Sequence, residues 1–238
     1  MSGTTEQEER RRRLLQIGSA AVFLAIVVVA VLIVVSANET SGGDTNLEDV
    51  GLVNRELQGL TQRGLVLGDP QAKVTLVEFG DLQCPVCKGF SEEIIPDVID
   101  SKVRSGEAKI EFRNYTIISQ ESTSAGAAAI AAGKQGRGWT FIELFYRNQG
   151  LEASGYVTDE FLTEIAKGAG VADIDEWNKD RKSQVTLAEV KRTTDEAEKL
   201  GLAGTPSFGV EGSATKGLET FGTPGSAEAL EEAIEAAA

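Results

Sequence analysis

The chain has 238 residues, of which 37 are acidic and 23 are lysine or arginine, giving a formal net charge of −14 at pH 7. This balance argues against nucleic acid or anionic lipid as a binding partner, because both need basic patches on the protein. The chain contains no histidine, which excludes His-dependent catalytic triads, histidine metal ligands and histidine acid–base catalysis.

The N-terminus predicts a membrane anchor. Residues 10–13 are all arginine, and the 22 residues from 14 to 35 include no charged side chain. A helix of that length measures about 33 Å, enough to cross a hydrocarbon core of about 30 Å. A cleaved signal peptide is the alternative, because residues 35–37 (Val-Ser-Ala) resemble a small-residue cleavage site. The apolar run is longer than the roughly 7–15 residues of a signal peptide, so we expect a retained anchor.

This anchor predicts the topology of the rest of the chain. Positive charge stays on the cytoplasmic side of a membrane, so we expect residues 1–13 in the cytoplasm and the chain after residue 35 outside it. The protein would then be a single-pass protein of the cell membrane, with its domain in a compartment where disulfides persist.

Residues 36–63 are expected to form a stalk or linker. Their first part, residues 36–46, is polar and rich in Gly, Ser and Thr, as in flexible linkers. Apolar side chains then recur at spacings of three and four: Leu47, Val50, Val53, Leu57 and Leu60. This spacing predicts a helix that either packs on the domain or lengthens the stalk.

The globular domain is expected over residues 64–238, and it begins with a strand–helix–strand pattern. Strands are predicted at residues 64–67 and 73–79. Residues 85–103 have helical periodicity, and Pro96 predicts a kink in that helix. Residues 108–115 alternate between apolar and polar side chains, which is typical of a strand.

Only helices are predicted over residues 119–200. They are expected at residues 122–135, 138–148, 158–167 and 173–200, the last of which is one helix or two. Aromatic side chains recur at helical spacing in the second of them, which is typical of core residues: Trp139, Phe141, Phe145 and Tyr146. Strands return at residues 206–210 and 216–221, and a last helix is expected at residues 226–237, with Ser226 as its N-cap.

The only two cysteines of the chain, Cys84 and Cys87, lie between the strand at residues 73–79 and the helix that follows. At a helix N-terminus, unpaired amide N–H groups and the macrodipole stabilise a thiolate. A Cys-x-x-Cys in that position therefore indicates a redox-active dithiol.

Two other uses of the cysteine pair are disfavoured. A structural zinc site needs four ligands, and the chain offers two cysteines and no histidine. A structural disulfide that closes so short a loop would constrain the unfolded chain little. Because the sequence carries no cofactor signature either, we expect neither a metal nor a cofactor.

Three features together resemble the DsbA-like thiol:disulfide oxidoreductases. They are the Cys-x-x-Cys at a strand-to-helix junction, the helical block, and residues 204–208 (Gly-Thr-Pro-Ser-Phe) before a strand. The resemblance covers residues 64–238, and it is greatest to membrane-anchored bacterial members that share residues 79–85 (Phe-Gly-Asp-Leu-Gln-Cys-Pro). It implies a thioredoxin-like α/β fold with an all-helical subdomain inserted at about residues 119–200, here preceded by one transmembrane helix.

The positions of the cysteines predict their roles. We expect Cys84 to be the nucleophile, and Cys87, one helical turn later, to be the more buried and less acidic resolving thiol. Pro85 suits the first helical turn, where its missing N–H is not needed, and it also shapes the access of a substrate to Cys84. Val86 stands where the best-known oxidases of the family have histidine. Since Val86 can neither donate a side-chain hydrogen bond nor carry charge, we expect a milder oxidant.

The resemblance also implies a role for the loop at Thr205 and Pro206. From the residues alone, Pro206 is either a trans proline that starts an edge strand or a cis proline; the resemblance implies cis. The loop would then face Cys84, and the Thr205 backbone would pair with an extended substrate segment. With Pro85 and Val86, these two residues make up the expected substrate-binding site.

Glu78 is the one charged residue in the apolar strand at residues 74–79. Strand alternation puts it on the face opposite Val77 and Phe79. If it is buried without a partner, its pKa is raised and it can exchange protons with Cys87. The alternative is a carboxylate at a strand edge that pairs with a lysine.

Residues and resemblance together predict an extracytoplasmic oxidoreductase that forms disulfides in exported proteins. Its partners would be exported proteins with cysteine thiols and a membrane redox partner, either a quinone-linked oxidase or an electron carrier. The same cysteines could instead serve a disulfide reductase or isomerase, because direction follows the potential of the partner. A non-catalytic adaptor that binds extended chains is a third function, and the presence of both cysteines argues against it.

Overall fold

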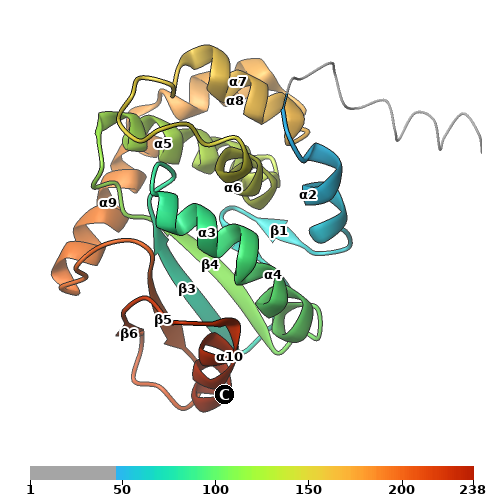
Figure 1. Cartoon of the computed structure of the whole chain (residues 1–238), viewed down its shortest axis with the longest axis vertical. Coiled ribbons are helices and arrows are strands. Elements are labelled where there is room, and N and C mark those ends of the chain that lie inside the picture. Colours follow the sequence, from blue (N-terminus) through green and yellow to red (C-terminus); the bar gives the residue numbers. More distant parts are fainter. Residues whose placement is uncertain (1–46) are drawn as a thin grey trace, which may run out of the picture. The chain divides into compact units, whose positions relative to one another are not determined.

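The computed structural model describes residues 47–238, so the expected cytoplasmic segment, the anchor and residues 36–46 lie outside the described residues. The described chain folds around one six-stranded sheet with helices on both faces (Figure 1). The strand order is β1-β2-β4-β3-β5-β6; β3 and β4 run parallel, and the other neighbouring pairs are antiparallel. The strands are β1 (Gln62–Arg63), β2 (Val66–Leu67), β3 (Val74–Gly80), β4 (Ala108–Asn114), β5 (Ser207–Glu211) and β6 (Glu219–Phe221).

The two faces of β3 contact different parts of the molecule. Val77 points to the face that α9 covers, where it clusters with Ala197. Leu76 points to the opposite face and belongs to the same apolar cluster as Cys87 of α3. Because successive side chains of a strand alternate between faces, Glu78 shares the face of Leu76. The sheet therefore presents Glu78 to the side on which the cysteine helix lies.

The helices of the described chain agree with those predicted, within a few residues at each end. They are α2 (Val50–Glu56), α3 (Pro85–Glu93), α4 (Ile95–Val98), the π-helical turn η1 (Ile99–Val103), α5 (Gln120–Lys134), α6 (Gly138–Arg147), α7 (Asp159–Gly168), α8 (Ile174–Arg181), α9 (Gln184–Lys199) and α10 (Ala227–Ala237). The predicted kink in the helix at residues 85–103 is present. The break falls at Ile94, and Pro96 lies in the first turn of α4, where its missing N–H leaves no bond unmade.

The predicted helical insertion comprises α5 to α9, which separate β4 from β5 in the chain. Helix α5 is at its centre and packs against α6, α8 and α9. Most of the buried positions of α5 are alanine or glycine, so these neighbours can approach closely. The charged segment at residues 173–200 forms two helices, because Ser183 caps a new one: its hydroxyl accepts a hydrogen bond from Thr186 N at 3.2 Å.

The segment assigned above to the end of the linker is part of the folded domain. Val53 of α2 is fully buried, and Glu56 pairs with Arg147 of α6 at 2.7 Å. The side chain of Gln62 in β1 donates to Thr140 Oγ1 at 2.8 Å. The expected boundary at Gly64 is therefore too late in the chain, and the helix packs on the domain rather than lengthening a stalk. Within residues 47–238, no helix is both long enough and apolar enough to span a bilayer.

Gly138, at the start of α6, lies where the β1–β2 turn comes closest to the insertion. A Cβ there would collide with the carbonyl oxygen of Gly64 and lie 2.9 Å from the Leu65 side chain. We expect Gly138→Ala to lower the free energy of unfolding by about 1–3 kcal/mol through overpacking, measured by urea denaturation. Gly89→Ala on α3 is the control, because nothing lies within 4 Å of its added Cβ. That change should stabilise by about 0.5–1 kcal/mol, and an equal loss in both variants would contradict the packing explanation.

Candidate active site

The two cysteines lie at the start of α3, directly after β3 ends. Gly80 is needed at this point, because an added Cβ would meet the Phe112 ring at 2.5 Å. Cys84 is the N-cap of α3 and Pro85 its first residue; Cys84 Sγ accepts a hydrogen bond from Cys87 N at 3.3 Å. Both thiols are free, so the structure describes the reduced dithiol. The predicted strand-to-helix position of the pair is confirmed.

The two thiols differ in acidity. Hydrogen bonding from the Cys87 thiol is the largest of several influences that together lower the pKa of Cys84 to about 6, and burial opposes them. The backbone amides of Val86 and Cys87 also lower it, as expected at a helix N-terminus. Burial raises the pKa of Cys87 well above its ordinary value. The expected asymmetry, with a more buried and less acidic Cys87, is therefore present.

The loop at Thr205 faces the cysteines. Cys84 Sγ lies 3.4 Å from Thr205 O, to which the thiol donates, and the Thr205–Pro206 peptide bond is cis, as the resemblance implied. Side-chain hydrogen bonds hold the loop on both sides: Ser207 Oγ donates to Gly204 O, and Thr223 Oγ1 donates to Pro206 O, each at 2.7 Å. Sequence positions more than a hundred residues apart thus form one site.

A groove of about 570 Å³ borders this loop. It is lined by the segments 200–205 and 220–223 together with Ser207, so Thr205 lies on its wall. On the other side of Cys84, Pro85 and Val86 are exposed, with 53% of Val86 accessible to solvent. The residues predicted to contact substrate therefore surround the Cys84 sulfur and leave the apolar side chain of Val86 open to solvent.

Glu78 is buried beneath this site, on the face opposite Val77 and Phe79 that the alternation in β3 predicted. It is 2% exposed, and its Oε1 has no hydrogen-bond partner within the described part of the chain. Burial raises the pKa of Glu78 to about 8, and the charges of Glu143 and Cys84 add to that shift. A carboxyl with this proton affinity, on the face of the sheet that α3 covers, can supply a proton to Cys87. The alternative of a strand-edge carboxylate paired with lysine is wrong.

The side chains of Asp81 and Gln83, which precede Cys84, hold in place the turn that carries it. Asp81 accepts hydrogen bonds from the backbone N of Gln83, Ile117 and Ile118 at 2.9–3.1 Å. Gln83 is fully buried; its amide donates to Ser119 and Ser122 and accepts from Ala153 N. A glutamine before a cysteine is no signal of such bonds, because all its partners are distant in the chain.

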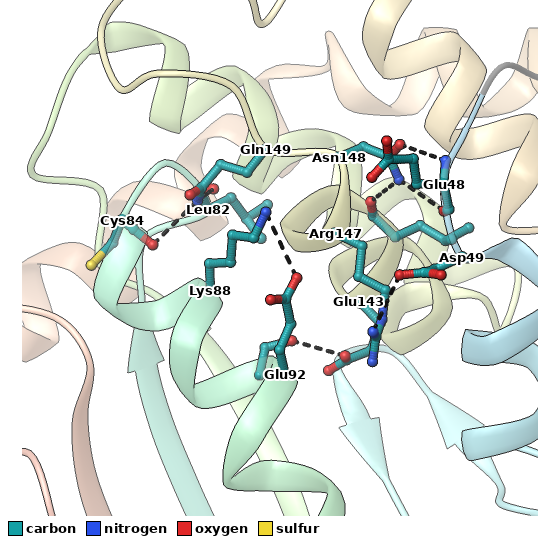
Figure 2. Close-up of polar contacts among 12 residues, drawn as sticks. Glu48, Asp49, Leu82, Cys84, Lys88, Glu92, Glu143, Arg147, Asn148 and Gln149 are labelled. Carbon is teal, nitrogen blue, oxygen red and sulfur yellow. Dashed lines mark hydrogen bonds and ion pairs between the residues drawn. The ribbon is translucent and has the colours of Figure 1, made fainter.

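Helix α6 also reaches the cysteine turn, through residues that the sequence gave no reason to select. Gln149, just after α6, donates to Leu82 O at 2.7 Å and to Cys84 O at 3.2 Å (Figure 2). The Tyr146 hydroxyl donates to Asp81 O at 3.3 Å. The aromatic side chains of α6 are buried as predicted, and the end of the helix positions the turn that carries Cys84.

Glu143 is a second buried carboxyl near the site. It is the one charged residue among the apolar residues 139–146, and it is 3% exposed. The signal that selected Glu78, a lone acid in an apolar run, would have found it. Within residues 47–238, no cluster of three or more Cys, Asp or Glu side chains could hold a metal ion. The described geometry therefore supports thiol–disulfide exchange at Cys84 and Cys87, with Glu78 buried on the face of the sheet that α3 covers.

Known proteins resemble this chain in sequence and in fold. The family described as thioredoxin matches residues 60–236. The probable disulfide bond formation protein D of Bacillus cereus is 31% identical over 149 residues, which are 61% of this chain and 69% of that protein. Disulfide bond formation protein D of Bacillus subtilis is 27% identical over 158 residues, or 66% of this chain and 71% of that protein.

Solved structures are also similar to the described chain. Oxidised BdbD from Bacillus subtilis has a TM-score of 0.64 at 25% identity, and the match covers 74% of this chain and 95% of BdbD. α-DsbA1 from Wolbachia pipientis shares the fold, with a TM-score of 0.61 at 17% identity over 73% of this chain and 89% of that one.

Proposed function

The chain belongs to the thioredoxin family and is a DsbA-like thiol:disulfide oxidoreductase, and from this premise we propose that it forms disulfide bonds in exported proteins. The observation that carries the proposal is the asymmetry of the dithiol. The pKa of Cys84 is lowered to about 6, whereas that of Cys87 is raised. A thiolate that is stable in the reduced enzyme makes the disulfide a stronger oxidant. The names of the Bacillus relatives support the same direction.

The proposed exchange has two steps. A substrate thiolate attacks Cys84 Sγ of the enzyme disulfide; the S–S bond breaks, and Cys87 leaves with the electron pair and takes up a proton. A second substrate thiolate then attacks the substrate sulfur of the mixed disulfide and displaces the Cys84 thiolate. The substrate gains a disulfide, and its two electrons remain on the enzyme as the reduced dithiol. The lowered pKa of Cys84 makes it a good leaving group in the second step.

The surface around Cys84 suits an extended, partly unfolded chain. Val86, Ile117, Leu151 and Leu200 are among the few large apolar side chains that the described residues expose. Two of them belong to loops tied to the cysteine turn, through Ile117 N to Asp81 and, near Leu151, through Ala153 N to Gln83. We propose that these side chains contact the substrate while its backbone pairs with Thr205 beside the groove.

The location and the redox partner are part of the proposal. The charge-free residues 14–35 after four arginines support a membrane anchor with the domain outside the cytoplasm. A membrane partner, either a quinone-linked oxidase or another electron carrier, would then restore the Cys84–Cys87 disulfide. Fractionation of cells, with protease added to intact spheroplasts, tests this arrangement: the domain should sediment with membranes and be digested from outside.

The direction of exchange can be tested in living cells by thiol trapping. Rapid acid quenching and alkylation should find the Cys84–Cys87 pair mostly oxidised, because an oxidase waits for substrate in its disulfide form. A mostly reduced pair would favour the reductase or isomerase alternative. If a Cys84→Ser chain restored full biological activity to a deletion strain, the non-catalytic adaptor would be the better explanation.

Val86→His should make the disulfide a stronger oxidant. A protonated or hydrogen-bonding imidazole beside the Cys84 sulfur would stabilise the thiolate, and therefore the reduced form. We expect the reduction potential to rise by about 30 mV or more, which corresponds to a tenfold change in the exchange equilibrium constant. The measurement is equilibration with glutathione buffers. An unchanged or lower potential would contradict the role assigned to this position.

A further inference from the structure

Glu143 of α6 is a buried carboxyl that the exchange steps above do not use. Its Oε2 accepts a hydrogen bond from Ser91 Oγ at 2.8 Å. Its Oε1 has no hydrogen-bond partner within the described part of the chain. Burial is the main cause that raises the pKa of Glu143 to about 7, so this carboxyl changes its protonation in the neutral range.

Ser91 connects this carboxyl to the helix of the dithiol. It follows Cys87 by four residues on α3, and residues four apart lie on one face of a helix. Both side chains are buried. Glu143 therefore contacts the same buried face of α3 as Cys87, one helical turn further from the N-terminus.

A cavity gives Glu143 a connection to water. It has a volume of about 230 Å³, room for several water molecules, and Glu143 and Ser91 form part of its lining. The lining also includes three exposed residues, Arg55, Asp100 and Arg104. Glu143 lines this cavity and Glu78 does not.

The cation nearest to Glu143 in the chain is already paired with other acids. Arg147 binds Glu56 at 2.7 Å. It also lies 3.6 Å from Asp49 (Figure 2), and both acids belong to the N-terminal segment around α2. The charged groups that face Glu143 from the elements packed against it are Arg147 on α6, Arg55 and Glu56 on α2, Glu92 on α3, Asp100 and Arg104 around η1, and Glu78 on β3. Glu143 is thus surrounded by mixed charge on its cavity side and by a dry interior on the other.

Two buried carboxyls that repel one another ionise one at a time. The better solvated carboxyl ionises first, and that carboxyl is Glu143, because it lines the cavity. We propose that Glu143 holds the single negative charge of this pair on the cavity side, and so keeps Glu78 protonated as the proton donor to Cys87. Glu143 acts through Glu78 and is therefore a positioning residue.

The consequence for exchange is a matter of proton supply. When the enzyme disulfide is reduced, Cys87 leaves with the electron pair, Glu78 gives it a proton, and solvent later returns a proton to Glu78. In the reduced protein, where its pKa is about 8, Glu78 is about nine-tenths protonated at pH 7 and half protonated at pH 8. Losing the Glu143 charge should lower that pKa by about one unit, leaving about a tenth of Glu78 protonated at pH 8. The inference rests on the dithiol exchange of the proposed function, but it holds for either direction of exchange.

The direct test is titration of the Glu78 carboxyl by ¹³C NMR in the reduced full-length chain, with its signal assigned by its loss in Glu78→Gln. In Glu143→Gln, the midpoint should fall by about one pH unit. Glu92→Gln is the matched control, because it removes a more exposed acid from α3 that pairs with Lys88 at 3.7 Å. That change should leave the midpoint in place. An unmoved midpoint in Glu143→Gln, or an equal shift in both variants, would overturn the proposal.

A kinetic double-mutant cycle separates this role from a structural one. Glu143→Gln should slow reduction of the disulfide by dithiothreitol severalfold at pH 8, because the loss of its charge lowers the protonated fraction of Glu78, and leave the rate unchanged at pH 5.5. In a Glu78→Gln background, the same change should have no effect. A loss of rate at both pH values, or in the Glu78→Gln background, would show a packing defect and overturn the proposal. Loss of all exchange in Cys84→Ser tests the proposed function separately, since it does not depend on Glu143.

Discussion

Cys84→Ser should abolish disulfide exchange, reducing the oxidation of a reduced substrate protein to the level of the enzyme-free blank. A serine hydroxyl cannot form the disulfide that carries the electrons. Cys87 cannot replace it, because it is fully buried and burial raises its pKa well above the ordinary value. The measurement is the rate of activity recovery of a reduced, unfolded substrate with glutathione disulfide as the terminal oxidant.

Cys87→Ser is the matched control for this prediction, since it changes the same atom one helical turn away. In that variant Cys84 still attacks disulfides, but no second thiol resolves the product. We therefore expect mixed disulfides between Cys84 and substrate to accumulate on non-reducing gels. If the two variants behaved alike, or if Cys84→Ser kept its activity, the assignment of nucleophile and resolving thiol would be wrong.

Glu78→Gln should slow exchange and remove part of its pH dependence. The variant has no acid to give its proton to the Cys87 thiolate, so we expect a loss of about tenfold at pH 7, below the roughly hundredfold low end of general acid catalysis. The wild-type rate should contain a component with a midpoint near pH 8, the pKa to which burial raises Glu78, and the variant should lack it. An unaltered pH profile would remove Glu78 from the mechanism.

Glu78→Gln should slow exchange but raise the free energy of unfolding. Glu78 has its pKa raised from 4.5 to about 8 in the folded, reduced protein, so the folded state keeps a proton that the unfolded state releases between these values. The contribution of Glu78 to the free energy of unfolding is fully present below about pH 4.5, and it is lost progressively as pH rises toward 8. At about 1.4 kcal/mol per unit the loss is at most about 5 kcal/mol.

Urea unfolding of the two reduced proteins at several pH values measures this loss. The free energy of unfolding of Glu78→Gln should rise steadily relative to that of the wild type from pH 4.5 to pH 8. Above pH 8 it should stay higher by a constant few kcal/mol. Glu92→Gln, a more exposed change of the same kind, should show no such trend. A difference that does not vary with pH would mean that Glu78 is not buried as a neutral acid.

The parts of the fold that could be predicted from the sequence are those set by local pattern. The apolar run before Cys84 predicts β3, the helical spacing after it predicts α3 and α4, and Pro96 predicts the break between them. Each depends on residues within one or two turns of chain. The docking of α2 was left open, because periodicity shows that a helix has an apolar face but not which surface that face covers.

The residues of the site also fall into those that a local pattern predicts and those that it does not. Cys84, Cys87 and Glu78 were identified because each is exceptional within its own segment, as one of two cysteines or as a lone acid in an apolar strand. The hydrogen bonds of Gln83 and Gln149 to the cysteine turn join residues 36–70 positions apart, and no local pattern encodes them. Glu143, like Glu78, is a lone acid in an apolar run. It was not selected, because its helix was interpreted as aromatic core.

The reduction potential of the Cys84–Cys87 pair in the isolated chain tests the central claim most directly. An oxidase of exported proteins without a histidine beside its nucleophile should be less oxidising than DsbA, at about −120 mV, and more oxidising than thioredoxin, at about −270 mV. Equilibration with glutathione buffers at pH 7, followed by alkylation of the free thiols, should give a value above about −200 mV. A potential at or below that of thioredoxin would contradict the account, because such a disulfide could not oxidise the thiols of exported proteins.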